Sequence, residues 1–127
     1  MQNILWIGLG GAAGSIARYL LDGAVSRLAG GAAFPFGTLV VNIVGSFLMG
    51  AVMQFGLGAA LVSPTLRIAL TTGLLGGFTT YSTFNYETLE LFREGAMGWA
   101  FANIGATVVL CLAAGFAGTM SVKSIWG

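Results

Sequence analysis

The segment GLLGGFTTYSTF, residues 73–84, lies inside a long apolar region yet gathers glycines and hydroxyl side chains. Glycine costs a helix about 1 kcal/mol relative to alanine, and threonine is a weaker helix former than leucine. We therefore expect the helix to be interrupted within residues 76–83. In hydrocarbon an unpaired backbone group is costly, so an interruption survives only where protein, water or an ion meets its polar groups. This segment is thus the first candidate for a functional site.

The regions on both sides of this segment are nearly free of charge. No charged residue occurs between Arg27 and Arg67, and none occurs from Gly95 to Val122. Of the 127 residues, 57% are hydrophobic and 7% are charged, whereas an average soluble domain carries about 25% charged residues. Because about 20 apolar residues are enough to cross the hydrocarbon core, the sequence predicts an all-α membrane protein.

Four such spans fit into the chain as a single domain, residues 1–127. We expect them at residues 4–21, 37–62, 66–92 and 97–122, with the third broken at mid-membrane depth. If the N-terminus marks one side, that side receives Arg67 and Lys123, and the other receives Arg18, Arg27 and Arg93. Two basic residues against three is a weak orientation signal, so the chain is expected to insert in either direction.

The composition also excludes several classes of function. The net charge of +1 offers no basic face for the phosphate contacts of nucleic-acid binding. Histidine is absent and Cys111 is the only cysteine, which excludes an intrachain disulfide and a cysteine/histidine metal cluster. No set of nucleophile, base and metal ligand can be assembled, so the sequence does not predict an enzyme.

Polar side chains recur in the apolar spans at helical spacing. The second span carries Thr38, Asn42 and Ser46, the third carries residues 79–83, and the fourth carries Asn103, Thr107 and Cys111. One interpretation is hydrogen bonding between helices, worth about 0.6 to 2 kcal/mol for each contact. The other is a hydrated path, because weak coordination at several successive sites is what ion conduction requires.

Tyr81, Phe84 and Glu87 follow the expected break. Tyr81 and Phe84 share a helix face and either pack in the ordinary way or present their positive ring edges to an anion. Glu87 is the ionisable group nearest the break. It is either an intramembrane functional acid or an interfacial residue grouped with Glu90 and Glu94.

The segment at residues 73–88, GLLGGFTTYSTFNYET, resembles the central signature of the Fluc-type fluoride channels of the CrcB family, GGxTTFSTFSxE. Residues 37–42, GTLVVN, are similar to the GTLxxN of that family's second helix. Gly10, Gly11, Gly14 and Arg18 match its glycine-rich first helix. The resemblance covers all four spans in order.

The resemblance implies an antiparallel, dual-topology homodimer in a bacterial inner membrane, with two pores that pass fluoride passively out of the cell. It also implies a structural sodium ion bound by the backbone carbonyls of Gly76 and Thr79. The implied pore residues are Arg18, Asn42, Tyr81, Ser82, Thr83, Phe84, Glu87, Thr107 and Cys111. Family members also exist as paralogous pairs, so a related subunit is the alternative partner.

This chain departs from the family pattern at three positions. Tyr81 replaces a phenylalanine, and its hydroxyl either donates to fluoride or obstructs the path. Asn85 replaces a serine, and Cys111 is a poorer hydrogen-bond donor than serine. These differences concern the conduction rate more than the fold.

The rival interpretation is a small proton-coupled multidrug exporter, which is also a four-span dimer of dual topology. Such an exporter needs an acid deep in its first helix to exchange protons for a cationic drug. The expected first span, residues 4–21, contains no carboxylate, and Asp22 is expected beyond its end. The fluoride channel is therefore the favoured prediction.

Overall fold

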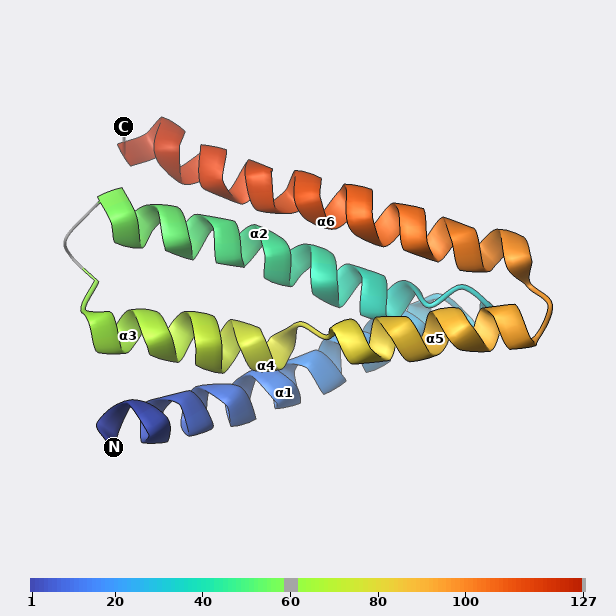
Figure 1. Ribbon diagram of the computed structural model, residues 1–127, viewed down its shortest axis with the longest axis horizontal. Helices are drawn as coiled ribbons and strands as arrows, with labels where there is room; N and C mark the ends of the chain where they lie inside the picture. Colours follow the sequence, from blue (N-terminus) through green and yellow to red (C-terminus); the bar gives the residue numbers. More distant parts are fainter. Residues whose placement is uncertain (59–61, 127) are drawn as a thin grey trace.

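The computed structural model describes residues 1–58 and 62–126, and within these residues the chain is all helical, with no strand (Figure 1). The elements are α1 (Gln2–Leu28), α2 (Phe36–Gly58), α3 (Pro64–Ile68), the π-helix η1 (Ala69–Leu75), α4 (Gly76–Phe78), α5 (Tyr81–Arg93) and α6 (Met97–Trp126). The expected second span, 37–62, includes residues 59–61, which lie outside the described residues.

The chain crosses its long dimension four times. Helices α1 and α2 are the first two crossings, the series from α3 to α5 is the third, and α6 is the last (Figure 1). The N-terminus and the C-terminal end of α6 lie at the same end of the bundle, and the α1–α2 and α5–α6 connections lie at the other. This up-and-down order agrees with four successive spans.

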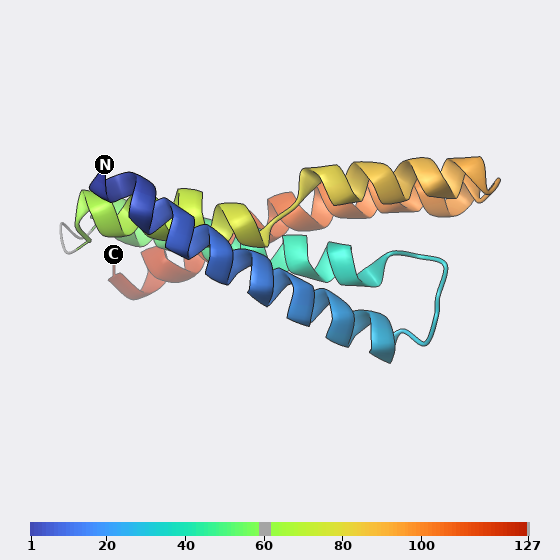
Figure 2. The same cartoon turned by 90° about the horizontal axis from the view of Figure 1, so that it is seen from below.

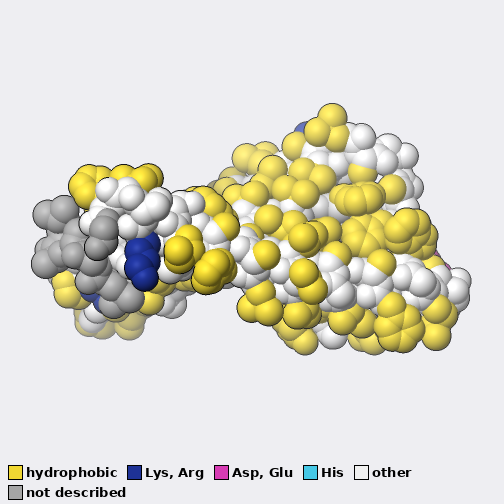
Figure 3. Space-filling model, turned by 90° about the horizontal axis from the view of Figure 1, so that it is seen from above, with side chains coloured by type: hydrophobic (Ala, Val, Ile, Leu, Met, Phe, Trp, Pro, Cys, Tyr) yellow, Lys and Arg dark blue, Asp and Glu magenta, His cyan; other side chains and the backbone are white. Residues whose placement is uncertain are grey.

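The outer surface is suited to hydrocarbon. Helices α1, α2 and α6 are each long and apolar enough to cross a membrane. Large side chains of α6, including Phe101, Leu112 and Phe116, are largely exposed, and hydrophobic side chains are spread over the face seen in Figure 3. A water-soluble monomer rarely exposes so much contiguous apolar surface. The chain is therefore a multi-pass membrane protein.

Two helices extend beyond the expected spans. Helix α1 continues to Leu28 rather than ending near residue 21, and α6 continues to Trp126 rather than to residue 122. Helical hydrogen bonding does not stop where the hydrocarbon ends, so a helix can run past the apolar stretch that marks a span. One consequence is that Asp22, expected beyond the first helix, lies within α1.

The third crossing is built from short pieces. Ser63 caps α3 by accepting from the Leu66 amide, and Pro64 takes the first helical position, which suits a residue without an N–H. After η1 and α4, Thr79 (φ −81°, ψ 155°) and Thr80 (φ −150°, ψ 113°) have extended backbones, and α5 then begins at Tyr81. The helix is thus interrupted over two residues, and Figure 2 shows the chain changing direction there.

Glycine lets the helices on both sides of this connector approach closely. A Cβ atom on Gly14 of α1 would overlap the Leu74 carbonyl oxygen, and one on Gly118 of α6 would overlap the Phe47 carbonyl oxygen. These contacts bring α1 against η1 and α4, and α6 against α2. Gly10 and Gly14 of the first helix therefore serve helix packing.

Candidate functional site

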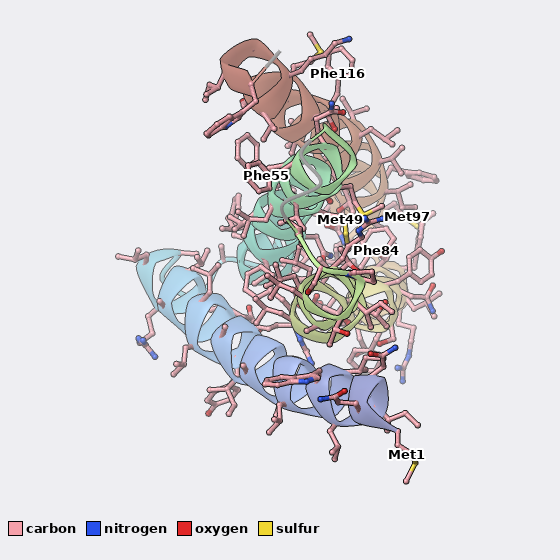
Figure 4. The ribbon with its side chains drawn as sticks, turned by 90° about the vertical axis from the view of Figure 1, so that its left-hand side faces the viewer. Met1, Met49, Phe55, Phe84, Met97 and Phe116 are labelled. Carbon is pink, nitrogen blue, oxygen red and sulfur yellow. The ribbon has the colours of Figure 1, made fainter. Side chains whose placement is uncertain are left out.

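A groove of about 720 Å³ runs along the middle of the bundle beside the interrupted crossing. Its walls come from three places: the centre of α2, the connector with the start of α5, and α6. The polar side chains along it belong to Asn42, Ser46, Thr79, Thr80, Tyr81, Thr107, Cys111 and Thr119, and the largest apolar ones to Met49, Phe84 and Leu112. Figure 4 shows Met49 and Phe84 in the same central region of the bundle.

Asn42 binds the main chain of the connector at two atoms. Its Nδ2 donates to the Thr80 carbonyl oxygen over 3.1 Å, and its Oδ1 accepts from the Thr80 amide over 2.9 Å. The Asn42 side chain is only 8% exposed. Because a buried backbone group without a partner is costly, this pair of hydrogen bonds is what permits Thr80 to leave the helix.

Thr80 also begins the next helix. Its hydroxyl oxygen accepts from the Thr83 amide over 3.2 Å, which is the usual N-cap bond. The same hydroxyl donates to the Thr83 hydroxyl over 3.0 Å and lies 3.4 Å from that of Ser82. The three hydroxyls therefore form one cluster at the start of α5.

These bonds leave particular carbonyl groups without their helical donors. In a continuous helix the Gly76 carbonyl would accept from the Thr80 amide, and the Thr79 carbonyl from the Thr83 amide. Both amides are diverted, the first to Asn42 and the second to the Thr80 hydroxyl. Within residues 1–58 and 62–126 no other hydrogen bond is found to end on either oxygen.

Arg18 satisfies a third carbonyl of the same turn. Its Nε donates to the Gly77 carbonyl oxygen over 3.2 Å, from a half-buried position on α1. The sequence led us to expect Arg18 at the pore, but it is not among the residues that line the groove. Its side chain instead donates to the backbone at the end of α4.

Tyr81 and Phe84 occupy one face of α5. Their ring centroids are 5.6 Å apart and the ring planes meet at 60°, an edge-to-face arrangement. Phe84 is buried, whereas Tyr81 is 78% exposed. Both rings line the groove, as does Gly45, whose missing side chain leaves room for the Thr79 methyl group and the Phe78 ring.

The three polar residues that share one face of α6, Asn103, Thr107 and Cys111, have two different roles. Thr107 and Cys111 line the groove. Asn103 is 2% exposed and turns toward α5, where its Nδ2 donates to the Thr88 hydroxyl over 2.9 Å. Asn103 therefore makes an interhelical hydrogen bond, whereas Thr107 and Cys111 lie on the groove wall.

Glu87 belongs to a different cavity. This second space, of about 280 Å³, lies between α5, the α1–α2 connection and the start of α2, and Glu90 and Glu94 also line it. Glu87 is half-buried, and its Oε1 has no hydrogen-bond partner among the described residues. Glu87 is thus separated from the groove that holds Asn42 and Phe84.

The structure brings together five of the nine predicted pore residues along the groove, which are Asn42, Tyr81, Phe84, Thr107 and Cys111. Ser82 and Thr83 belong to the adjoining hydroxyl cluster, and Arg18 and Glu87 lie elsewhere. The sequence analysis named Thr80 only as part of the polar segment 79–83, and it did not name Met49 or Thr119. Met49 shares a helix face with Asn42, so its spacing along α2 could have identified it.

The apolar helices, the interrupted third crossing and the polar groove together define a small multi-pass membrane protein with a partly polar groove among its helices. Residues 5–119 match the family described as CrcB-like protein, Camphor Resistance (CrcB), and the chain belongs to this family. The resemblance seen in the sequence is thereby confirmed.

Several relatives match over nearly the full length of the chain. A protein of Sorangium cellulosum is 48% identical over 98% of this chain and 98% of its own, and one of Geobacter sulfurreducens is 50% identical over 98% and 100%. One from Geobacter metallireducens is 47% identical over the same shares as the latter. All three are named as fluoride-specific ion channels, which agrees with the prediction that this chain is not an enzyme.

Proposed function

We propose that this protein is a fluoride-selective channel that passively exports fluoride across a bacterial inner membrane. The observation that carries the proposal is the groove, which collects Asn42, Phe84 and Thr107 from three separate helices in a member of a family whose relatives are named as fluoride channels. The second N–H of Asn42 and groove hydroxyls with a free proton, such as that of Tyr81, would replace part of the ion's water shell, whereas the Thr107 hydroxyl donates to Asn103. Among the described residues no lysine or arginine lines the groove to hold the anion tightly.

The aromatic pair would supply the anion-facing edges. An aromatic ring is positive at its edge and negative on its face, so Tyr81 and Phe84 favour fluoride if their edges point into the path. Ser82, Thr83 and Cys111 would extend the coordination on either side. Glu87, in the separate acid-lined cavity, would lie at one mouth of the path.

A structural sodium ion fits the connector. Na⁺ prefers oxygen ligands, and unwound backbone carbonyls are a known source of them in membrane proteins. The Gly76 and Thr79 carbonyls are among those that lose their helical amide donors at the break, while Arg18 takes up the Gly77 carbonyl between them. When bound, the ion would supply positive charge that satisfies these two oxygens inside the membrane.

The functional unit would be an antiparallel dimer of two chains inserted in opposite directions, with two pores. Exposed polar and aromatic groups at the break, above all Tyr81, need such a partner to be shielded from lipid. The weak charge asymmetry of the sequence supports self-pairing, and a paralogous subunit is the alternative partner.

The test is efflux from liposomes that contain the purified protein and are loaded with potassium fluoride or potassium chloride. We expect rapid fluoride efflux once a potassium ionophore removes the opposing voltage, and chloride efflux slower by at least about a hundredfold, a difference of roughly 2.7 kcal/mol. Equal rates for the two anions would contradict a selective channel. Absence of any flux would contradict a self-sufficient homodimer.

Topology is tested separately. In a Cys111→Ser background, a cysteine placed in the α5–α6 connection is exposed to a membrane-impermeant thiol reagent added outside whole cells. Dual topology predicts labelling of about half of the molecules, since neither orientation is favoured. Labelling of all or none of them would show a single orientation.

A further inference from the structure

Asn103 is the most enclosed polar side chain on α6. It is 2% exposed, and with Val41 it is one of the two largest side chains that are fully buried in the described part of the chain. It is not among the residues that line the groove, although Thr107, one helical turn further along α6, is. An amide buried this deeply is destabilising unless its polar atoms are paired.

Both ends of the Asn103 amide are paired. Its Nδ2 donates to the Thr88 hydroxyl over 2.9 Å, and its Oδ1 accepts from the Thr107 hydroxyl over 3.4 Å. The Thr88 hydroxyl in turn donates to the Phe84 carbonyl oxygen over 2.7 Å. A continuous chain of hydrogen bonds therefore runs from the groove wall on α6 to the first turn of α5.

The order of donors strengthens this chain. Thr88 receives a hydrogen bond from an amide while it donates to a carbonyl, and bonds arranged head to tail in a low-dielectric interior polarise one another. A threonine hydroxyl bonded to the carbonyl four residues earlier also bends a helix. The position of the Phe84 backbone is therefore sensitive to whether Asn103 holds Thr88.

The first turn of α5 is thus held from two sides by two asparagines. Asn42 of α2 fixes Thr80, immediately before the turn, and Asn103 of α6 fixes Phe84, at its end, through Thr88. Asn103 simultaneously holds the Thr107 hydroxyl. One buried amide consequently sets two groove-lining groups, the Phe84 ring and the Thr107 hydroxyl, relative to each other.

We infer that Asn103 is a positioning residue for the ion path: it acts through Thr88 on Phe84 and directly on Thr107, and so determines how well the path distinguishes fluoride from chloride. This inference rests on the proposed function. Asn103 itself does not touch the ion, because its carbonyl and one N–H are committed and its side chain is shut off from the groove.

The experiment compares four single variants and the Asn103→Leu/Thr88→Val double variant with the wild-type protein in liposomes. Asn103→Leu replaces the amide by an apolar group of similar shape, and Thr88→Val removes the hydroxyl that it binds. Thr88→Ser keeps that hydroxyl. Ser121→Ala is the matched control on α6, because Ser121 is exposed and its hydroxyl donates to the Ala117 carbonyl of its own helix. The measured quantities are fluoride efflux, chloride efflux and hydrogen–deuterium exchange of residues 81–88.

We expect Asn103→Leu and Thr88→Val each to lower the ratio of fluoride to chloride efflux about tenfold and to speed exchange in residues 81–88, as loss of a buried hydrogen bond does. The double variant should lose no more than either single variant, because both interrupt the same chain. Thr88→Ser should keep the ratio of fluoride to chloride efflux within about twofold of wild type. Ser121→Ala should change nothing.

The inference is overturned if Asn103→Leu lowers thermal stability while the efflux ratio stays at the wild-type value. Additive losses in the double variant overturn it as well. Should Asn103→Leu not fold, the contrast between Thr88→Val and Thr88→Ser decides the matter. A wild-type protein without fluoride efflux would refute the proposed function, and exchange in residues 81–88 would still decide whether Asn103 positions the turn.

Discussion

The side-chain amide of Asn42 pairs with the amide and the carbonyl of Thr80, as a neighbouring strand would, across two different crossings of the bundle. This pair explains how a helix is interrupted in an apolar setting without leaving the polar groups of Thr80 unpaired. It also diverts the Thr80 amide from the Gly76 carbonyl. The groove, the carbonyls offered to a cation and the start of α5 all depend on this contact.

Replacing Asn42 by aspartate should abolish this pairing. A carboxylate still accepts from the Thr80 amide, but it has no N–H for the Thr80 carbonyl and brings two oxygens close to it. We expect fluoride efflux to fall at least tenfold and the free energy of unfolding to fall by about 1 to 3 kcal/mol. Liposome efflux and thermal unfolding in detergent measure the two effects.

Gln54→Glu is the matched control, since it makes the same amide-to-carboxylate change on α2 at a position outside the groove lining. Wild-type efflux from Asn42→Asp would show that the connector holds its shape without the Asn42 donor.

Arg18 should contribute to stability through the connector. Arg18→Met keeps much of the apolar stem but removes the hydrogen bond to the Gly77 carbonyl. Because that carbonyl lies at the end of α4, we expect a loss of about 1 to 3 kcal/mol in the free energy of unfolding and reduced fluoride efflux with unchanged anion selectivity. The control is Arg27→Met, which removes an exposed arginine near the end of the same helix. Equal losses in the two variants would assign the effect to charge alone.

Sodium should stabilise the protein, and side-chain changes at Thr79 should not remove the effect. Because main-chain carbonyls are the proposed ligands, Thr79→Val leaves them in place and removes only a hydroxyl that donates to the Leu75 carbonyl. We expect the Tm to fall in both proteins when Na⁺ is exchanged for N-methylglucamine, as loss of any ligand of the native state requires. A Tm that does not change when sodium is removed would contradict the sodium site.

Close packing of α6 on α2 predicts opposite outcomes for two glycines of α6. Gly118→Ala should destabilise the protein by about 2 kcal/mol or more, since the new methyl group would overlap the Phe47 carbonyl. Gly98→Ala, which has open space around it, should be neutral or stabilise by up to about 1 kcal/mol. Urea or thermal unfolding of the two variants measures the difference, and a similar cost at both sites would contradict the packing described.

The sequence predicted the four crossings and the position of the interruption because both follow from local properties. Charge-free apolar length marks a span, and clustered glycine and threonine disfavour a helix. It did not predict that the interruption is only two residues long, because this depends on the bonds from Asn42 and Arg18, residues that lie far from the connector along the chain. It also did not indicate that Arg18 donates to the Gly77 carbonyl, since a cation in an apolar helix offers no signal of which carbonyl it binds.

The sequence likewise could not assign the partners of the polar residues on α6. Their spacing identified Asn103, Thr107 and Cys111 as one face, but a helix face is broad enough to meet two neighbours. Asn103 points into the α5 contact, and the other two point into the groove. The way α5 and α6 cross decides which of these residues meets α5 and which meets the groove, and the sequence alone did not reveal how the two helices cross.

Finally, the two aromatic rings of the groove should differ in importance. Phe84 is buried and its backbone is fixed through Thr88, whereas Tyr81 is mostly exposed and its hydroxyl has no hydrogen bond within the described residues. Phe84→Ile removes the ring edge at the fixed position, so fluoride efflux should fall at least tenfold, the loss of an interaction of about 1.4 kcal/mol or more. Tyr81→Phe keeps the edge and removes only the hydroxyl, so efflux should stay within about threefold of wild type. A large loss in Tyr81→Phe would instead identify the Tyr81 hydroxyl as a direct donor to the ion, and a large gain would identify it as an obstruction.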